Sequence, residues 1–218
     1  MAHPYTCILF DLDGTIIDSA PGITATLAYT FEALGRPIPS PSQLLEYVGP
    51  PILDSFMQLA GMTPVEAHQA LATYRVRYLE TGVTNATVYP GVGDVLRAVH
   101  ESGVPLSLAT SKPESLARLA LTHLGMAPFI DLFTGASEDE TRSAKVDVVT
   151  EALHRLTAFG ADISNPVMVG DRHYDVDGAG QAGVPTIFVE WGYGSPAEQV
   201  GAVAVAHTPA ELQKLLLG

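Results

Sequence analysis

The feature that most constrains the fold of this chain is an apolar segment, residues 5–10, that runs directly into Asp11-Leu12-Asp13-Gly14-Thr15. An apolar run bounded by acidic and glycine residues is typical of a strand buried on both faces, as in a parallel sheet. Open α/β sheets place their ligands at the carboxyl ends of the strands. Asp11 and Asp13 therefore leave the strand where chemistry is expected, and their burial requires a cation, a shared proton or solvent. Mg²⁺ would supply that cation.

Composition limits the class of protein and its partners. The chain has 218 residues, of which 47% are hydrophobic, so it can bury a core as one large domain or two small ones. A formal net charge of -13 predicts no nucleic-acid partner and no anionic membrane surface. The single cysteine, Cys7, excludes an internal disulfide and is expected to be a packing residue. No signal-peptide pattern or membrane-length apolar run occurs, which predicts a soluble cytoplasmic protein.

The segment after Asp13 reads as helical, with no strand-like run before residues 83–89. Ser19 is expected to cap a helix that runs to about Leu34, and Thr63-Pro64-Val65-Glu66 is a capping box with proline at the first helical position. Between these helices, Gly49-Pro50-Pro51 predicts a stiff loop. We therefore expect residues 16–88 to form an inserted α-helical cap domain.

From residue 89 onward, strand-like and helical segments alternate. This alternation predicts an α/β fold with a Rossmann-like parallel sheet covered by helices on both faces, built from residues 1–15 and 89–218. A second capping box, Thr208-Pro209-Ala210-Glu211, predicts a terminal helix. The remaining expected strands are 105–109, 130–133, 166–169 and 185–189, and the expected helices are 92–100, 114–124, 145–158 and 176–182.

Three predicted strands end on residues that carry chemistry. Asp11 and Asp13 follow the first, Thr110-Ser111 the second, and Gly170-Asp171 a later one, with Asp175 four residues further on. In a parallel sheet these ends share one edge, so the carboxylates would form a site for a hard cation such as Mg²⁺. Lys145, at a predicted helix start, would balance the charge of a phosphate or of a nucleophile there.

This set of motifs resembles the haloacid-dehalogenase superfamily of phosphatases over nearly the whole chain. The segment Asp11–Thr15 is similar to its first motif, Thr110 to its second, Lys145 to its third, and Gly170-Asp171 with Asp175 to its fourth. The helical insertion resembles the branch that contains phosphoglycolate phosphatases and 5′-nucleotidases. Three further segments are similar to that branch: Gly49-Pro50-Pro51, Thr110-Ser111-Lys112-Pro113 and Gly192-Tyr193-Gly194.

The resemblance implies a role for each motif residue. Asp11 would be the nucleophile that forms an aspartyl-phosphate, and Asp13 would be the general acid and then the base. Mg²⁺ would bind Asp11, the backbone carbonyl of Asp13, and Asp171, with Asp175 acting directly or through water. The phosphoryl oxygens would be held by Thr110, the backbone N–H of Ser111, and Lys145.

The cap is expected to close over this site through hinges near residues 15–19 and 83–89. Closure would bring Gly49 and Arg75 against the leaving group of the substrate, so selectivity would come from the cap. One departure from the family pattern is Val146, which stands after Lys145 where relatives often carry proline.

The leading hypothesis is a Mg²⁺-dependent phosphomonoester hydrolase that acts on a small phosphorylated metabolite, as phosphoglycolate phosphatases do. A 5′-nucleotidase acting on nucleoside monophosphates is the first alternative. A sugar phosphomutase is disfavoured because Ile23 stands where mutases carry a histidine, and a dehalogenase because Asp13 is present. A non-enzymatic phosphate-binding protein would usually lack a motif residue, and none is missing. The sequence leaves the oligomeric state open.

Overall fold

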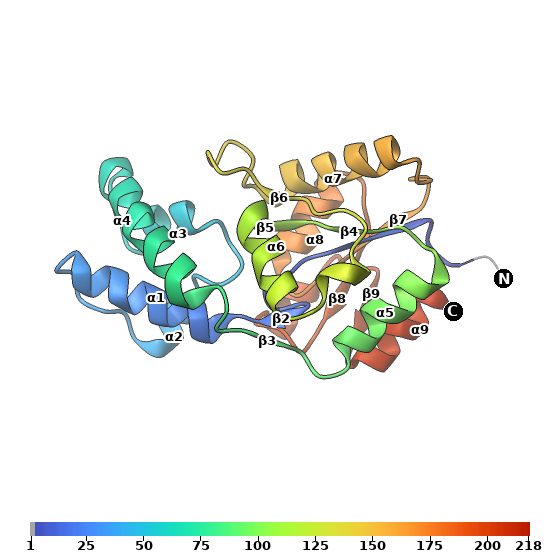
Figure 1. Ribbon diagram of the computed structural model, residues 1–218, viewed down its shortest axis with the longest axis horizontal. Coiled ribbons are helices and arrows are strands. Elements are labelled where there is room, and N and C mark those ends of the chain that lie inside the picture. The colour runs from blue at the N-terminus through green and yellow to red at the C-terminus, as the bar shows by residue number, and fades with distance from the viewer. Residues whose placement is uncertain (1–2) are drawn as a thin grey trace.

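A computed structural model describes residues 3–218 and shows a sheet flanked by helices, with a second group of helices at one end (Figure 1). Within these residues the central sheet has five strands in the order β4, β1, β7, β8, β9, and all neighbours are parallel. This confirms the predicted α/β fold. None of the helices in the described part of the chain is long and apolar enough to span a bilayer. The strands are β1 (Cys7–Phe10), β4 (Leu106–Leu108), β7 (Pro166–Gly170), β8 (Thr186–Val189) and β9 (Ala204–Ala206).

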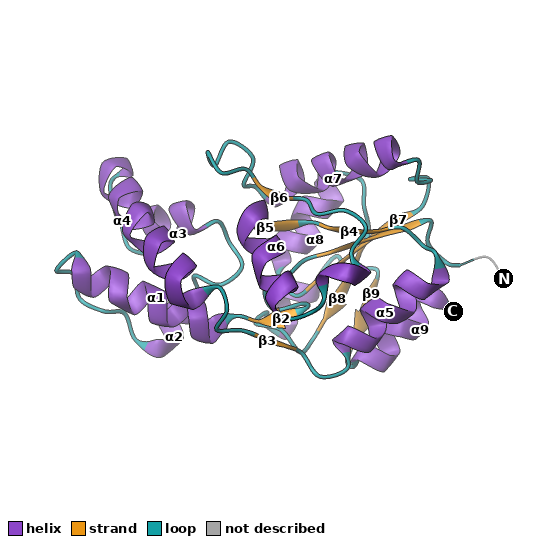
Figure 2. Ribbon diagram, in the orientation of Figure 1, coloured by secondary structure: helices purple, strands orange, loops and turns teal. Residues whose placement is uncertain are grey.

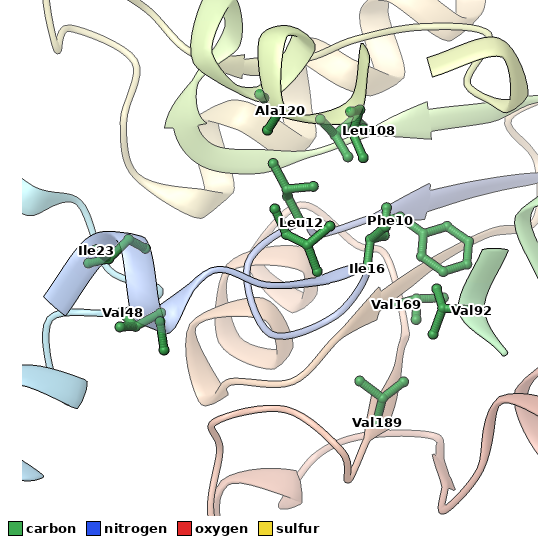
Figure 3. Packing of buried hydrophobic residues seen from close by; sticks show 14 of the residues in the cluster. Phe10, Leu12, Ile16, Ile23, Val48, Val92, Leu108, Ala120, Val169 and Val189 are labelled. Carbon is green, nitrogen blue, oxygen red and sulfur yellow. The ribbon is translucent and has the colours of Figure 1, made fainter. Parts of the chain in front are cut away.

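The side chains of β1 alternate between two apolar clusters, one on each face of the sheet. Ile8 and Phe10 pack with residues from α5 (Val92–Ser102) and α9 (Pro209–Leu217). Figure 3 shows Phe10 beside Val92 and Val169 in this cluster. Cys7 and Leu9 pack with residues from α7 (Lys145–Phe159) and α8 (His173–Gln181), on the other face (Figure 2). Burial on both faces is why the strand is apolar at every position.

Cys7 has the packing role that its position predicts. Its side chain is fully buried, and that burial raises the pKa of the thiol to about 11. The thiolate is the reactive form of cysteine, so this residue is chemically inert at neutral pH.

The predicted strand at residues 130–133 is wrong. After β4 the chain forms β5 (Thr110–Pro113), α6 (Glu114–His123) and a short helical turn, η2 (Ala127–Phe129), and β5 then pairs in parallel with β6 (Gly135–Ala136). Leu132 makes only an isolated bridge to Ser107. The Asp131 carboxylate accepts the backbone N–H of Leu106 at 2.9 Å, so a side chain takes the place of a ladder partner there. Strand β9 has no counterpart among the expected strands, because Ala-Val-Ala is too short a segment to show a strand pattern.

The predicted helical insertion is present between β1 and β4. It enters and leaves through β2 (Ile17–Asp18) and β3 (Thr87–Val88), which pair antiparallel. Its helices lie beyond the carboxyl ends of the sheet strands (Figure 1). The domain boundaries at residues 15/16 and 88/89 stay a prediction. The insertion contains α1 (Ala20–Ala33), α2 (Pro41–Leu45), α3 (Ile52–Gln58), α4 (Pro64–Arg77) and a π-helical turn, η1 (Tyr78–Gly82).

Both predicted helix starts in the insertion are confirmed, but only one of them has the side-chain cap expected of it. At α4 the Thr63 hydroxyl accepts the N–H of Glu66, and the Glu66 carboxylate accepts the N–H of Thr63 at 2.8 Å, which completes the capping box. At α1 the Ser19 side chain makes no capping bond. The hydroxyl of Tyr193 instead accepts the N–H groups of Ser19 and Ala20, at 2.8 and 2.9 Å. A distant tyrosine therefore caps the first helix of the insertion.

Two other helix starts differ from expectation. Thr208 caps α9 by accepting the N–H of Glu211 at 3.2 Å, but the Glu211 carboxylate accepts from His207 rather than completing the box. The helix expected from residue 176 begins at His173 instead. The Asp175 carboxylate accepts the N–H of Arg172 at 3.0 Å. This bond stabilises the first turn of α8, which precedes the apolar residues from which the helix was predicted.

The insertion has an aromatic core centred on Phe56. This ring is fully buried, and its centroid lies 6.1 Å from that of Phe31, 6.2 Å from that of Tyr47 and 6.4 Å from that of Tyr74. Edge-on and tilted aromatic contacts add to the area burial of the rings. The insertion therefore holds its helices together with side chains of its own.

We predict that Phe56→Ala lowers the free energy of unfolding by about 3–5 kcal/mol, because a buried ring is replaced by a cavity. Urea denaturation followed by circular dichroism measures the change. The matched control is Phe159→Ala at the end of α7, where the side chain is 57% exposed and the expected change is below about 0.5 kcal/mol. An equal decrease in the free energy of unfolding for the two variants would contradict the conclusion that Phe56 stabilises the insertion by packing in its core.

Candidate active site

The carboxyl ends of the sheet strands and the start of α7 bring the predicted motif residues together. Asp11 and Asp13 follow β1, Thr110 begins β5, Asp171 follows β7, and Lys145 is the first residue of α7. These side chains come from segments that are far apart in sequence but share the edge of the sheet that faces the insertion (Figure 1). All five residues are buried.

Lys145 joins two of the carboxylates. Its Nζ donates to Asp11 Oδ1 at 2.6 Å and to the carbonyl of Ala109 at 3.1 Å, and it lies 2.8 Å from Asp175 Oδ1. Burial alone would lower the pKa of Lys145, but Asp11 and Asp175 outweigh it and hold that pKa above its ordinary value. Burial raises the pKa of Asp11 to about 6 even though Lys145 opposes the rise. One ammonium therefore does not fully compensate the negative charge gathered here.

Asp171 is the second focus of negative charge. Its Oδ1 accepts the Thr15 hydroxyl at 3.1 Å, and its Oδ2 accepts the N–H of Tyr193 at 2.7 Å. Burial, followed by the carboxylates of Asp175 and Asp11, raises the pKa of Asp171 well above its ordinary value. Two hydrogen bonds fix the orientation of this side chain without removing the repulsion from its neighbours.

The geometry of Asp11, Asp171 and Asp175 fits a divalent metal ion. Each offers a carboxylate oxygen, and these oxygens all lie within 4.8 Å of one another. At such distances two like charges repel by a few kcal/mol even at an effective dielectric constant of about 20. Three carboxylates and the Lys145 ammonium leave two negative charges, which one Mg²⁺ would balance with the oxygen ligands it prefers. Asp175 Oδ1 is buried and lies 2.8 Å from the Lys145 ammonium, and a carboxylate oxygen paired in this way keeps a second lone pair that can bind a metal.

The Asp13 carboxylate does not belong to this group of oxygens. Lys112 Nζ donates to Asp13 Oδ1 and Oδ2 at 3.0 and 3.1 Å and to the Tyr78 hydroxyl of η1 at 2.7 Å. Burial would lower the pKa of Lys112, but Asp13 and Tyr78 hold it above its ordinary value. The two carboxylates after β1 are therefore paired with different lysines, and only the backbone carbonyl of Asp13 remains as its predicted metal ligand.

Sequence reasoning did not give Lys112 a role in the site. Lys112 belongs to a segment that is similar to the phosphatase branch, but nothing in the neighbouring sequence shows that its ammonium reaches Asp13. Lys112 follows Thr110 and Ser111 in β5, and the Thr110 hydroxyl accepts the Lys112 N–H at 3.3 Å. The strand thus places a hydroxyl, a backbone N–H and an ammonium side by side.

A cavity of about 60 Å³ lies between Asp13 and the insertion. Gly49 lines it with a φ of +110°, a conformation that glycine adopts without strain. The loop is fixed from the core, because Arg172 Nη1 donates to the carbonyl of Val48 at 2.6 Å. The cavity is also lined by polar and charged residues and by apolar ones: Tyr47, Tyr74, Arg75, Tyr78, Ser111, Lys112 and Glu140, and Ile23, Pro50, Ile52, Leu71, Pro113 and Leu116.

Arg75 lines the same cavity, but its charge is already paired. Its guanidinium forms an ion pair with Glu140 and donates to the carbonyl of Glu138 at 3.1 Å. Both acceptors belong to the loop between β6 and α7, so Arg75 connects the insertion to the core. Its expected contact with a substrate stays a prediction.

Tyr193 connects the candidate metal site to the entrance of the insertion. Its N–H holds Asp171, while its hydroxyl donates to Asp18 Oδ1 at 2.8 Å and accepts from the start of α1. Beside it, Trp191 donates its indole N–H to the carbonyl of Thr15 at 3.1 Å. The sequence analysis singled out the Gly192-Tyr193-Gly194 segment only by resemblance. No local pattern shows that an aromatic hydroxyl will cap a helix that lies at the other end of the chain.

Comparison with known proteins decides the family. The family model for haloacid dehalogenase-like hydrolases matches residues 8–189 of the chain. The chain belongs to this family. Among solved structures, a predicted phosphatase from Clostridium acetobutylicum matches with a TM-score of 0.90 and 34% identity, over 96% of this chain and 97% of that one. The fold predicted from the motifs is thereby confirmed.

The curated relatives of this chain are named for more than one activity. The tyrosine-protein kinase PtkA of Mycobacterium tuberculosis is 38% identical over 86% of the chain, which spans only 62% of that protein. A 5′-nucleotidase of Pseudomonas aeruginosa is 35% identical over 97% of the chain and 94% of its own length. A plasmid-encoded phosphoglycolate phosphatase of Cupriavidus necator is 30% identical over 98% and 94%.

We predict that Gly14→Ala weakens divalent-cation binding by about 10- to 100-fold, the scale for disturbing a group that orients a metal ligand. A Cβ at Gly14, where φ is +90°, would overlap the Asp171 carboxylate. Titration calorimetry with Mg²⁺ measures the affinity. The control is Gly35→Ala, which has a φ of +64° but nothing within 4 Å of the added carbon. A similar loss of affinity in both variants would attribute the effect to backbone strain instead.

Proposed function

We propose that this protein is a Mg²⁺-dependent phosphomonoester hydrolase that works through an aspartyl-phosphate and acts on a small metabolite of the 2-phosphoglycolate type. The observation that carries the proposal is the different pairing of the two carboxylates after β1. Asp11 lies with Lys145 in the candidate cation site, whereas Asp13 lies with Lys112 at the cavity. One carboxylate is thus placed to receive a phosphoryl group and the other to serve its leaving group.

The proposed reaction divides hydrolysis into two displacements. An oxygen of Asp11 attacks phosphorus, and the bond to the leaving oxygen breaks as Asp13 gives that oxygen a proton. Asp13 then takes a proton from water, whose oxygen attacks the same phosphorus atom. Orthophosphate leaves and the Asp11 carboxylate is restored. Proton transfer of this kind contributes about 10²- to 10⁴-fold to the rate.

Several groups of the chain are proposed to hold the phosphoryl oxygens. Lys145, Thr110 and the backbone N–H of Ser111 lie at the same strand edge as Asp11, where fixed donors stabilise developing negative charge. Mg²⁺, when bound by Asp11, Asp171, Asp175 and the Asp13 carbonyl, would neutralise and orient those oxygens.

The cavity supports a small leaving group. Its volume of about 60 Å³ corresponds to about two water molecules, at about 30 Å³ each. A two-carbon hydroxy acid is of this size, whereas a nucleoside is several times larger. The Lys112 ammonium at the cavity also suits a leaving group that carries a negative charge.

A 5′-nucleotidase is the second candidate, and the aromatic lining of the cavity favours it. Tyr47 and Tyr74 line the cavity, and aromatic side chains are groups on which a nucleobase can stack once they are exposed. The insertion would have to move away from the core to admit a nucleoside. Relative kcat/KM values for 2-phosphoglycolate and for nucleoside monophosphates, measured with Mg²⁺, distinguish the two candidates.

The charge of the chain fits a small substrate rather than a polymeric anion. With a net charge of -13, the surface repels nucleic acids and anionic lipids. We therefore propose no nucleic-acid or membrane partner.

We predict that removing divalent metal abolishes hydrolysis, because phosphate and the three carboxylates repel one another at close range. The measurement is release of orthophosphate from 2-phosphoglycolate in excess chelator, followed by addition of Mg²⁺, which should restore the rate. Undiminished turnover by a preparation shown to be metal-free by elemental analysis would exclude the mechanism.

We also predict that Asp11→Asn abolishes turnover and phosphoryl transfer to the protein, whereas Asp13→Asn slows turnover by about 10²- to 10⁴-fold. Mass spectrometry after acid quenching, combined with peptide mapping, reports which residue carries the phosphoryl group. Only Asp11 should be modified in the parent protein. A label on any other residue would disprove the assignment of the nucleophile.

A further inference from the structure

Lys112 is a buried cation at the boundary between the core and the insertion. Its side chain is 6% exposed, and its three hydrogen bonds go to two oxygens of Asp13 and to the Tyr78 hydroxyl. The Asp13 bonds stay within the core, whereas the Tyr78 bond crosses to η1. Lys112 also lines the cavity that is proposed to receive the leaving group.

The pairing with Lys112 engages the carboxylate that must serve the leaving oxygen. Because Lys112 donates to both oxygens of Asp13, one lone pair on each oxygen is occupied and the carboxylate is held toward the ammonium while Lys112 stays in this position. The flexible stem of a lysine permits the ammonium to move, but a buried ammonium moves only toward another acceptor. Its position at the cavity means that a substrate can provide that acceptor.

The other cations near the cavity are less available. The Arg75 guanidinium is paired with Glu140 and with the Glu138 carbonyl. Arg172 is paired with Glu198 at 2.8 Å and donates to the Val48 carbonyl. Lys112, by contrast, donates one of its hydrogen bonds to the neutral Tyr78 hydroxyl. A carboxylate that replaced the Tyr78 hydroxyl would bind the ammonium more strongly, because charge-assisted hydrogen bonds are roughly twice as strong as neutral ones.

We propose that Lys112 determines specificity by binding a carboxylate on the leaving part of the substrate, and that this contact draws it away from Asp13. The inference rests on the proposed phosphatase function and narrows its substrates to phosphomonoesters of small hydroxy acids. Tyr78 would then be displaced by the substrate, so the contact between core and insertion changes when a matching substrate binds. A neutral leaving group supplies no such partner and leaves Asp13 engaged.

The test compares two substrates that differ in this one group, 2-phosphoglycolate and 2-hydroxyethyl phosphate. For the parent protein we expect kcat/KM to favour the carboxylate. In Lys112→Met the preference should fall by roughly 10- to 100-fold, the scale for losing a hydrogen bond to a charged group. The loss should come from 2-phosphoglycolate, whereas hydrolysis of 2-hydroxyethyl phosphate should not become slower, because the variant no longer engages Asp13. Tyr78→Phe, which keeps the ammonium but removes its neutral partner, should retain the preference.

Controls separate this proposal from a structural role and from the proposed function itself. Inhibition by orthophosphate reports the phosphoryl site, and its inhibition constant should be the same in Lys112→Met and the parent. Equal losses for both substrates, or loss of the preference in Arg75→Met in place of Lys112→Met, would overturn the proposal. A parent protein that hydrolyses both substrates equally would overturn it while the phosphatase function stands. Failure to hydrolyse any phosphomonoester would refute the function instead.

Discussion

The structure depends on gathering negative charge at one edge of a parallel sheet. Asp11, Asp171 and Asp175 are buried within a few ångströms of one another, and desolvation of each carboxylate costs several kcal/mol. Lys145 offsets part of that cost by pairing with two of them. Burial, followed by the repulsion between the carboxylates, raises the pKa of Asp11 and of Asp171, and the remaining charge fits a divalent cation. Burying these carboxylates therefore lowers the stability of the folded chain at the place where the proposed chemistry requires concentrated charge.

The helical insertion is tied to this edge by polar contacts rather than by a shared apolar core alone. Tyr193 binds both Asp171 and the start of α1, Lys112 binds both Asp13 and η1, and Arg172 holds the carbonyl of Val48. Each contact begins at or beside a residue of the candidate site. Because hydrogen bonds to neutral partners exchange at little net free energy, such contacts can be replaced by a substrate when the insertion moves.

Sequence reasoning succeeded where a local pattern has one physical explanation. The apolar run before Asp11 has to be a strand buried on both faces, and Thr63 to Glu66 forms the capping box that its spacing predicts. It failed where a distant group changes the local outcome. The Asp131 carboxylate accepts the N–H of Leu106 in β4, where the strand expected at 130–133 would have supplied a backbone carbonyl, and Tyr193 takes the capping role expected of Ser19. Both errors come from side chains that compete for backbone hydrogen bonds.

The amino-acid sequence by itself determined the fold class, the position of the insertion and the residue types at the strand ends, since hydrophobic period and strand-end position are local properties. Only the tertiary structure decided how charges pair at the site. Asp11 and Asp13 are two residues apart, yet one meets Lys145 and the other Lys112. Ion pairing depends on distances of a few ångströms between segments about a hundred residues apart, and only the packed sheet and insertion fix those distances.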